Sequence, residues 1–417
     1  MLAATALVAC AAGCGGGAGA SAVTSEREWR ALGTAVVPGR TMLPRLEASS
    51  ASGLLCSFQD RTAGANRGSV VRYDAAAQTW RYLGAAGAAS VGTDWWGAVQ
   101  AGSAGVLYRA NRDYGFANDG LGFWRYDPGT ASWAPFGSQP LSVGEAHYID
   151  LELDTSGRPV LAFQDGTTAQ PAGPGSGGAL TVLRIDPGSG AATALGGAAF
   201  TRAFTTPSDA THGDLAVSAN GTLWAAWIEH AQGGEHPRVA RFDAGPGTWT
   251  LVGSPANGLP NIGSHVAIAV DSTGRPLIAF RGNGPLRFLV YRMDLGTLTW
   301  SQVGADISAS QLSGGAYPGF SVEAGYRERT PFAVGPADGL YLSHLAPDAS
   351  QVDRVKVFSF RGGAWLPLGS TGFLPGTEQE DYTSLAVISE GGVEVPFVTC
   401  RRAPLTANER LVGYAFR

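Results

Sequence analysis

The chain repeats one pattern of apolar and polar positions. Its clearest copy covers residues 290–304, where Val-Tyr-Arg-Met-Asp is followed by the turn Leu-Gly-Thr-Leu and then by Thr-Trp-Ser-Gln-Val-Gly. Side chains that alternate with a period of two on both sides of a short turn predict a β-hairpin. Similar segments occur at residues 71–84, 124–137, 182–196, 239–253 and 355–369.

A second hairpin pattern precedes each of these segments. It is clearest at residues 149–163 and 266–280, where alternating apolar residues lead into an Asp-x-x-Gly turn and a further apolar strand. An Asp at the start of a tight turn accepts hydrogen bonds from backbone N–H groups, which favours a structural role for this motif over a calcium loop. Weaker copies lie at residues 46–58, 99–110, 215–227, 332–344 and 385–397. Each repeat therefore contains four strands, which we label a to d in chain order.

The two ends of the chain supply the strands that are missing from this count. Seven a–b hairpins are present but only six complete c–d hairpins. Residues 412–416 have the pattern of strand c, and residues 29–33 have that of strand d. A ring in which the N-terminal strand completes the last sheet leaves no sheet incomplete. The sequence therefore predicts an all-β fold, a seven-bladed β-propeller of four-stranded antiparallel blades over residues 28–417.

A tryptophan recurs in strand d, most often within the motif Trp-x-x-Leu-Gly. A large apolar side chain at one position of most repeats predicts packing between neighbouring blades. In this motif the chain resembles seven-bladed β-propeller surface lipoproteins of bacteria. The resemblance implies the fold but no activity, because propellers support unrelated functions. The aligned residues are Trp29, Trp80, Trp133, Thr193, Trp249, Trp300 and Trp365.

The composition narrows the classes of function. A net charge of −5 argues against a nucleic-acid partner. No run of 18 apolar residues occurs, so no membrane-spanning helix is expected. Neither a phosphate-binding loop nor a dinucleotide fingerprint is present, and we expect no cofactor. The 60 Gly and 24 Pro residues favour short strands joined by turns.

The N-terminal residues have the pattern of an export signal. A short apolar run is followed by Leu-Val-Ala-Cys10 and Ala-Ala-Gly-Cys14, which resemble the cleavage box of bacterial lipoproteins. The resemblance implies lipidation of Cys10 or Cys14 after residues 1–14 have directed export, with residues 15–27 as a flexible tether. We therefore expect an exported monomer held in the bacterial envelope by a lipid anchor.

The two remaining cysteines, Cys56 and Cys400, fall in the first and last blades. Aligning the strands gives these side chains opposite facing, so we expect two buried free thiols and no disulfide.

The long connections predict where a ligand binds. The a–b and c–d turns are short, whereas the b–c and d–a connections vary in length and meet at one face of a propeller. Insertions on one face are typical of a binding face in repeat proteins. All six histidines are predicted at this face and outside strand interiors. Alignment of the a strands predicts a partly aromatic ring around the channel mouth, formed by Leu43, Trp96, Tyr148, His212, His265, Arg329 and Tyr382.

From this face we select the candidate ligand-binding residues, which combine flat rings with hydrogen-bonding groups. They are Trp95, Trp96, Arg112, Asp113, Tyr148, His212, Glu229, His230, His265, Arg329 and Tyr382. No catalytic residue and no metal ligand is assigned.

Three functions remain open from the sequence. The first is a non-enzymatic module that binds a glycan or a protein at the mouth, in a lectin-like manner. The second is a polysaccharide hydrolase or lyase, in which two acids act as an acid/base pair and histidines bind a metal. Its acids would come from Asp94, Asp113, Glu229 and Asp381, and its histidines from His212, His230 and His265. The third is a structural scaffold of an envelope assembly, which predicts an exposed apolar patch.

Overall fold

The computed structural model describes residues 27–33, 37–38, 41–49, 53–62, 66–166, 178–204, 209–231, 234–261, 263–282, 287–308, 311, 331–348, 350, 352–369, 374–403 and 409–417. Cys10, Cys14 and Arg329 lie outside these residues, as does the predicted tether up to residue 26.

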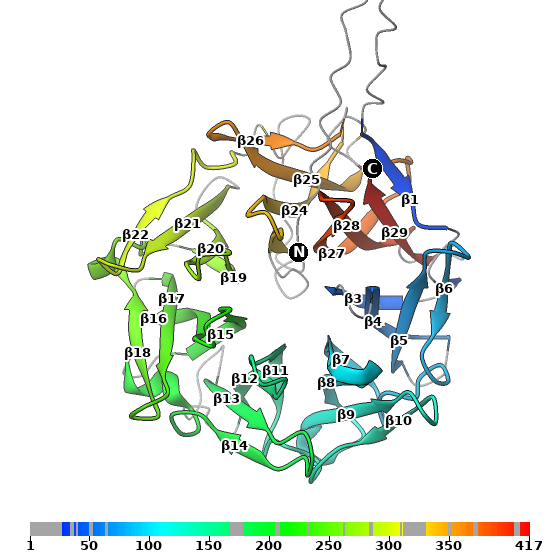
Figure 1. Ribbon diagram of the computed structural model, residues 1–417, viewed down its shortest axis with the longest axis horizontal. Helices are drawn as coiled ribbons and strands as arrows, with labels where there is room; N and C mark the ends of the chain where they lie inside the picture. The colour runs from blue at the N-terminus through cyan, green and yellow to red at the C-terminus, as the bar shows by residue number, and fades with distance from the viewer. Residues whose placement is uncertain are drawn as a thin grey trace, which may run out of the picture.

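Seven antiparallel sheets are arranged in a ring, as the repeat predicts (Figure 1). Blade 1 contains β3 (Thr41–Ser49), β4 (Gly53–Asp60), β5 (Arg67–Asp74) and β6 (Thr79–Tyr82). Blade 2 contains β7 (Asp94–Ala101), β8 (Leu107–Asp113), β9 (Leu121–Asp127) and β10 (Ser132–Pro135). Blade 3 contains β11 (Ala146–Leu153), β12 (Pro159–Asp165), β13 (Ala179–Ile185) and β14 (Ala192–Ala194). Blades 4 and 5 contain β15 (Asp209–Val217), β16 (Leu223–Ala231), β17 (Gly234–Asp243) and β18 (Thr248–Gly253); and β19 (Ser264–Val270), β20 (Pro276–Arg281), β21 (Phe288–Asp294) and β22 (Thr299–Gln302). Blade 6 contains β23 (Phe332–Val334), β24 (Leu340–Pro347), β25 (Asp353–Arg361) and β26 (Ala364–Pro367). Short 3-10 turns lie at Ser103–Gly105, Ala117–Asp119, Phe200–Ala203 and Pro255–Asn257.

The seventh blade joins the two ends of the chain. It contains β27 (Glu380–Glu390), β28 (Val393–Arg402), β29 (Arg410–Phe416) and, at its outer edge, β1 (Trp29–Ala31). Trp29 pairs with Phe416 and Ala31 pairs with Tyr414 in antiparallel register, so the predicted closure is confirmed. A further two-residue strand, β2 (Val37–Pro38), also pairs with β29 and was not predicted.

The apolar core is divided among the joints between blades. Each of the seven clusters of buried apolar residues combines side chains of two neighbouring blades. Between blades 3 and 4, for example, Leu180 packs in the same cluster as Trp227 and Trp249. Burial of this apolar surface is the main stabilising contribution to each joint.

A hydrogen bond from the strand-d tryptophan crosses most of these joints. In each case the indole N–H donates to the backbone carbonyl of the Leu or Val that precedes Gly in the preceding blade's motif. Trp133 donates to Leu83 at 2.6 Å, and Trp29 donates to Leu368 at 3.0 Å across the closing joint. The other pairs are Trp80–Leu32, Trp249–Leu195, Trp300–Val252 and Trp365–Val303. We call these six bonds the indole belt.

The glycine of the motif makes room for the next tryptophan. Gly84 has φ +78°, and a Cβ there would lie 3.0 Å from Cδ1 of Trp133. At Gly196 the corresponding atom would lie 2.4 Å from Trp249. The left-handed backbone and the close contact both disfavour a side chain. The motif Trp-x-x-Leu-Gly therefore combines an indole ring, a backbone carbonyl that accepts a hydrogen bond, and a glycine that leaves space for the indole ring of the following blade.

The joint between blades 2 and 3 has no belt bond. Strand pairing places Ala192 opposite Ile185, the position that Trp133 occupies opposite Tyr126, so the alignment of Thr193 with the tryptophans was wrong by one residue. The outer strand of blade 3 has no tryptophan to mark the aligned position, so the sequence can be aligned with either of two neighbouring residues there, which explains the error. Here the backbones approach directly, because a Cβ at Gly190 would lie 2.5 Å from the amide nitrogen of Gly137.

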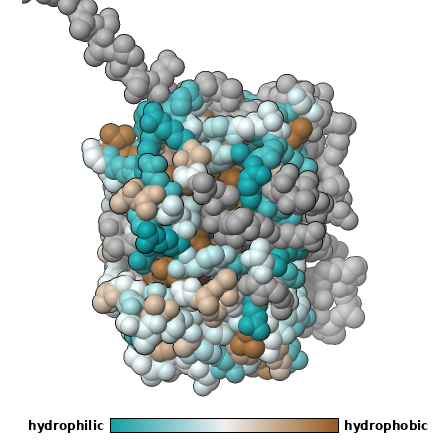
Figure 2. Space-filling view, turned by 90° about the vertical axis from the view of Figure 1, so that its right-hand side faces the viewer, coloured by the Kyte–Doolittle hydropathy of each residue, from teal (hydrophilic) through white to brown (hydrophobic). Residues whose placement is uncertain are grey.

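Other predictions about the scaffold are also tested. Cys56 and Cys400 are buried free thiols, as expected. The carboxylate of Asp271 accepts backbone N–H bonds from Thr273 and Arg275 at 3.0 Å, which confirms the structural role of the Asp-x-x-Gly turn. None of the described helical segments has the length and apolarity needed to cross a membrane. On the side of the ring shown in Figure 2, residues of polar or intermediate hydropathy predominate and hydrophobic residues form small separate groups.

Replacing Trp29 with Ala should weaken the closing joint, because it removes a buried ring and the hydrogen bond to Leu368. We expect a loss of about 3–5 kcal/mol in the free energy of unfolding, measured by urea denaturation. Arg30→Ala, at an exposed position of the same strand, should change it by less than about 0.5 kcal/mol. Equal effects of the two substitutions would contradict this account of ring closure.

Candidate functional site

The innermost strand of most blades contains the same irregularity. Near its start an extra residue disturbs the pairing with the second strand, as between Trp95 and Ala98 in β7 and between Thr211 and Asp214 in β15. These are β-bulges, which redirect side chains at the ends of sheets. Six blades place a non-glycine residue with φ between 47° and 53° at this point. They are Leu43, Trp96, Tyr148, His212, His265 and Tyr382.

These six residues are those that the sequence alignment placed around the mouth, and Arg329 alone lies outside the described residues. The left-handed conformation costs an ordinary residue about 1–2 kcal/mol relative to the right-handed one. Glycine would remove that cost, yet every one of these positions has a sizeable side chain. Backbone strain that recurs at one site of a fold indicates that the side chains themselves are needed there.

Four of the bulge side chains form a continuous arc of rings, which we call the rim arc. The ring centroid of Tyr148 lies 5.5 Å from that of Trp96 and 4.3 Å from that of His212. The ring of His212 lies 4.5 Å from that of His265, and Trp95 tilts against Trp96 at 5.7 Å. The rim arc thus spans blades 2 to 5 and combines ring faces with polar nitrogen atoms.

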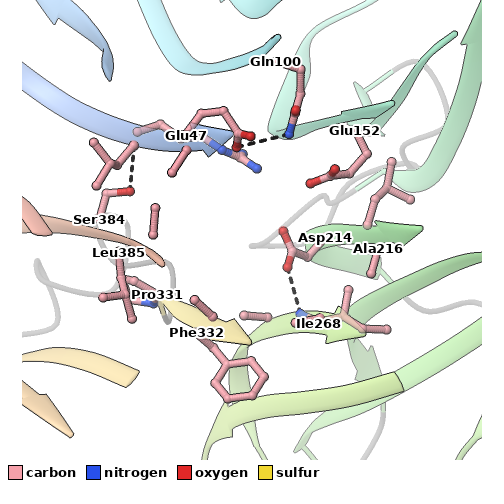
Figure 3. A pocket seen from close by; sticks show the side chains of 18 of the residues that line it. Glu47, Gln100, Glu152, Asp214, Ala216, Ile268, Pro331, Phe332, Ser384 and Leu385 are labelled. Carbon is pink, nitrogen blue, oxygen red and sulfur yellow. Dashed lines mark hydrogen bonds between the residues drawn. The ribbon is translucent and has the colours of Figure 1, made fainter. Parts of the chain in front are cut away.

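Beside the rim arc lies the cavity of the central channel, with a volume of about 410 Å³. This volume is typical of a small-ligand pocket. Trp96, Tyr148, His212 and Tyr382 contribute to its wall, together with residues of all seven innermost strands. Figure 3 shows the side chains of Gln100, Glu152 and Asp214 on one side of this cavity and that of Glu47 next to Gln100.

The cavity wall contains a network of charged groups. The guanidinium of Arg45 donates to the buried carboxylate of Asp150 and, at 3.3 Å, to the carbonyl of Ile149. Gln100 donates to a carboxyl oxygen of Glu47 at 3.3 Å. Asp214 accepts the backbone N–H of Ile268 at 2.8 Å, which links blades 4 and 5.

Two of these carboxyl groups hold their protons more strongly than usual. Burial raises the pKa of Glu47 to about 8, although the positive charge of Arg45 acts to lower it. Burial also raises the pKa of Glu152 well above its ordinary value, and the neighbouring carboxylates Asp150 and Glu47 raise it further. Removal from water disfavours the ionised form of a carboxyl group, which explains both directions.

Arg112 lies behind the rim arc and holds a polar cluster together. One guanidinium nitrogen contacts the ring of His147 at 3.2 Å, and the other donates to Asp119 at 2.9 Å and approaches Glu145 at 3.3 Å. Its guanidinium carbon also lies 5.9 Å from the ring centroid of Trp96. Burial lowers the pKa of His147. Arg112 is buried and is not among the residues that line the cavity.

Three further candidates lie away from the cavity. The buried carboxylate of Asp113 accepts backbone N–H bonds from Val91 and Gly92 at 2.7 Å, and Glu229 forms an ion pair with Arg238 at 2.6 Å. His230 contacts the hydroxyl of Thr211 at 2.7 Å. None of the three is among the residues that line the cavity.

The other two acids proposed for catalysis, Asp94 and Asp381, form ion pairs within their own blades. Asp94 is buried and forms an ion pair with Arg109 at 2.6 Å, and burial raises its pKa. Asp381 forms a two-pronged ion pair with Arg401, whose guanidinium lies against the ring of Tyr382 at 4.8 Å. Within the described part of the chain, no group of three or more His, Cys, Asp or Glu side chains is arranged to hold a metal ion.

The expectation that histidines avoid strand interiors was wrong. His212 and His265 lie within β15 and β19 at the bulges, and His344 pairs with Lys356 in the middle of β24. The strands extend past the bulges, because pairing resumes beyond the extra residue. Burial lowers the pKa of His344 to about 3, so this histidine is a neutral core residue.

The carboxyl groups of the cavity were missed. Asp150 and Glu152 alternate with apolar residues in Ile-Asp-Leu-Glu-Leu, and Arg45 and Glu47 have the same spacing in β3. This alternation was interpreted only as a strand signal. Charged residues at alternate positions of a strand at the centre of the ring were the available indication of a polar channel.

Comparison with known proteins gives the fold. No protein-family model matches the chain, and no curated protein matches it. Among solved structures, an ulvan lyase of a new polysaccharide lyase family has a TM-score of 0.56 at 10% identity over 93% of this chain and 96% of its own. Its complex with a -[GlcA(1-4)Rha3S]- ligand has a TM-score of 0.54 at 10% identity, with coverages of 92% and 95%. A puromycin hydrolase mutant has a TM-score of 0.53 at 14% identity over 88% of this chain and 50% of its own. At these identities the likeness establishes a common fold alone.

The stability of the protein should depend on the protonation of Glu47. The pKa of this group is raised from an ordinary 4.5 to about 8 by folding, so the folded state retains a proton that the unfolded state releases. Its contribution to stability is complete below about pH 4.5 and is lost as the pH rises to about 8. Glu47→Gln should therefore raise the melting temperature, relative to the parent protein, more at about pH 8 than at about pH 5.

The control for this measurement is Asp127→Asn, at an exposed outer turn. It should leave the difference in melting temperature between the two pH values as in the parent protein. A constant offset of Glu47→Gln at both pH values would show that Glu47 does not titrate in this range.

Proposed function

We propose that the protein binds a carbohydrate chain at the channel mouth, with the sugar rings on the rim arc. The observation that carries this proposal is the row of strained bulge positions at which Trp96, Tyr148 and His212 line the cavity and the buried His265 continues the ring contacts behind them. The apolar face of a sugar ring packs on aromatic rings, and its hydroxyls require polar neighbours.

The wall next to the rim arc supplies such neighbours. Gln100, Asp214 and Thr383 line the cavity together with the rim residues Trp96 and Tyr382. A cavity lined by both aromatic rings and hydrogen-bonding groups fits a polyhydroxylated ligand better than a flat protein surface. The similarity in fold to ulvan lyases supports the carbohydrate assignment by analogy.

A purely structural role has less support. That role predicts an apolar docking patch and a mouth without converging polar groups. The described large apolar residues that are exposed come from different parts of the chain, such as Val143, Leu295 and Leu366. The mouth is concave and polar, as described above. These observations favour ligand binding over scaffolding.

Removing the ring of Trp96 should separate binding from stability. Both Trp96→Ala and Trp96→Gly should lose affinity by about tenfold or more for the oligosaccharide that the parent protein binds best on a glycan array, measured by calorimetry. The Gly variant should nevertheless be more stable than the Ala variant by about 1 kcal/mol, because glycine relieves the positive φ of 51°.

Leu366→Ala, on the outer strand β26, is the control and should retain the parent affinity. The proposal fails if the parent binds no oligosaccharide on the array. It also fails if both Trp96 variants bind as the parent does.

Polysaccharide cleavage at the same cavity is the second candidate function. Its supporting observation is Glu47, whose pKa of about 8 leaves the carboxyl protonated at neutral pH. A protonated carboxyl group is the general acid that cleavage of a glycosidic bond needs, with a second carboxyl group as its partner. Glu152 and Asp214 line the same cavity and are candidates for the partner.

Cleavage is tested by incubating the protein with a panel of polysaccharides and measuring new reducing ends and unsaturated sugars. Enzymatic function predicts turnover that is lost in Glu47→Gln and retained in Asp127→Asn. Binding without turnover by the parent protein would exclude this candidate and leave the binding function in place.

A further inference from the structure

The acidic groups of the cavity come from three blades and face a single cation. Glu47 lies on β3, Glu152 on β11 and Asp214 on β15, and all three line the cavity. Arg45 is the only Lys or Arg among its described lining residues. Its guanidinium is directed to Asp150, a fourth carboxylate. The cavity therefore contains more acidic groups than basic ones.

Two of these acidic groups accept hydrogen bonds from described residues. Gln100 donates one hydrogen bond to Glu47, and the backbone of Ile268 donates one to Asp214. In the described part of the chain, no group donates a hydrogen bond to the carboxyl of Glu152, which Figure 3 shows directed into the cavity. An ionised carboxyl group has four acceptor positions, so Glu47 and Glu152 can receive further donors once they lose their protons.

The electrostatics of the cavity disfavour further negative charge. Burial raises the pKa of Glu152, and the neighbouring carboxylates raise it further. Burial disfavours a charge of either sign, whereas the neighbouring carboxylates disfavour an anion alone. A sulfate or carboxylate of a ligand would experience the same repulsion, strengthened by the low polarity around it. An ammonium group would instead favour ionisation of the carboxyl groups and donate three hydrogen bonds to them.

We propose that the cavity selects glycans that carry free amines, with an ammonium group bound among Glu47, Glu152 and Asp214, and rejects sulfated or uronate-containing chains. This inference rests on the proposed carbohydrate binding at the rim arc. It adds that the rim arc binds the sugar rings, while the carboxyl groups of the cavity discriminate between the charged groups that the sugars carry. Repulsion of the wrong ligand contributes to the selectivity as much as attraction of the right one.

The test compares three oligosaccharides with the same length and linkage that differ only in the nitrogen substituent. They are β-1,4-linked glucosamine, its N-acetylated form and its N-sulfonated form, titrated into the full-length protein by calorimetry at about pH 5.5, where the sugar amines are protonated. We expect the amine form to bind about tenfold or more tightly than the acetylated form and the sulfonated form to bind least. Binding of the amine form should release protons, seen as a dependence of the observed heat on the buffer, because it favours ionised carboxyl groups.

Substitutions of the cavity carboxyl groups test which residues cause the preference for the amine form. Glu152→Gln and Asp214→Asn should each reduce the preference for the amine form over the acetylated form by about tenfold. Affinity for the acetylated form should fall much less than affinity for the amine form in both variants. Parent-like circular dichroism spectra and melting temperatures should show that the variants are folded. Asp127→Asn, outside the cavity, should keep the full preference.

The outcomes distinguish this inference from the proposed function. Equal affinities for the amine and acetylated forms, with both lost in Trp96→Gly, would overturn the charge selectivity and leave carbohydrate binding intact. Tighter binding of the sulfonated form would likewise overturn it. Failure of all three to bind, together with an empty glycan array, would overturn both.

Discussion

The ring depends on one hydrogen bond that is repeated around it, from the indole of an outer-strand tryptophan to a backbone carbonyl of the blade before. The donor is rigid and the acceptor belongs to the main chain, so the bond fixes the distance between neighbouring sheets with little dependence on other side chains. Each bond is modest in net energy, about 1 kcal/mol. It also constrains geometry, because at six of the seven joints it fixes the position of one outer strand against the blade before it.

A scaffold that is fixed at its outer edge leaves its inner edge free to vary. The innermost strands share the same bulge, yet the residue at the bulge is an aromatic ring in some blades and Leu43 in another. The strain at these positions is tolerated because the blades are held elsewhere. This arrangement explains why residues with a positive φ can project toward the channel without a loss of the fold, and why the variation gathers at one mouth.

Much of the fold could be predicted from the sequence, and only part of the site. The spacing of Trp, Leu and Gly reports local geometry that every blade needs, so the strands, the number of blades and the closure by Trp29 followed from pattern alone. The ring at the mouth also followed, since Trp96, Tyr148 and His212 occupy equivalent positions. The carboxyl groups did not, because alternation in a strand shows which residues share a face but not what lies opposite. Glu47 and Glu152 acquire their properties from their position in a channel that all seven blades form together. The same limit applies to Asp113 and Glu229, whose partners inside their own blades are invisible in one sequence.

Among the residues that the structure describes, the joint between blades 2 and 3 is the one seam of the ring without an indole hydrogen bond. Ala192 provides no indole there, so the outer edges of these two blades lack the clasp that the other joints have. On the channel side of the same seam, Trp96 from one blade meets Tyr148 from the other. A ligand that rested on both rings would connect blades 2 and 3 across this seam. Its binding would then stabilise the contact between the two blades that lack an indole hydrogen bond.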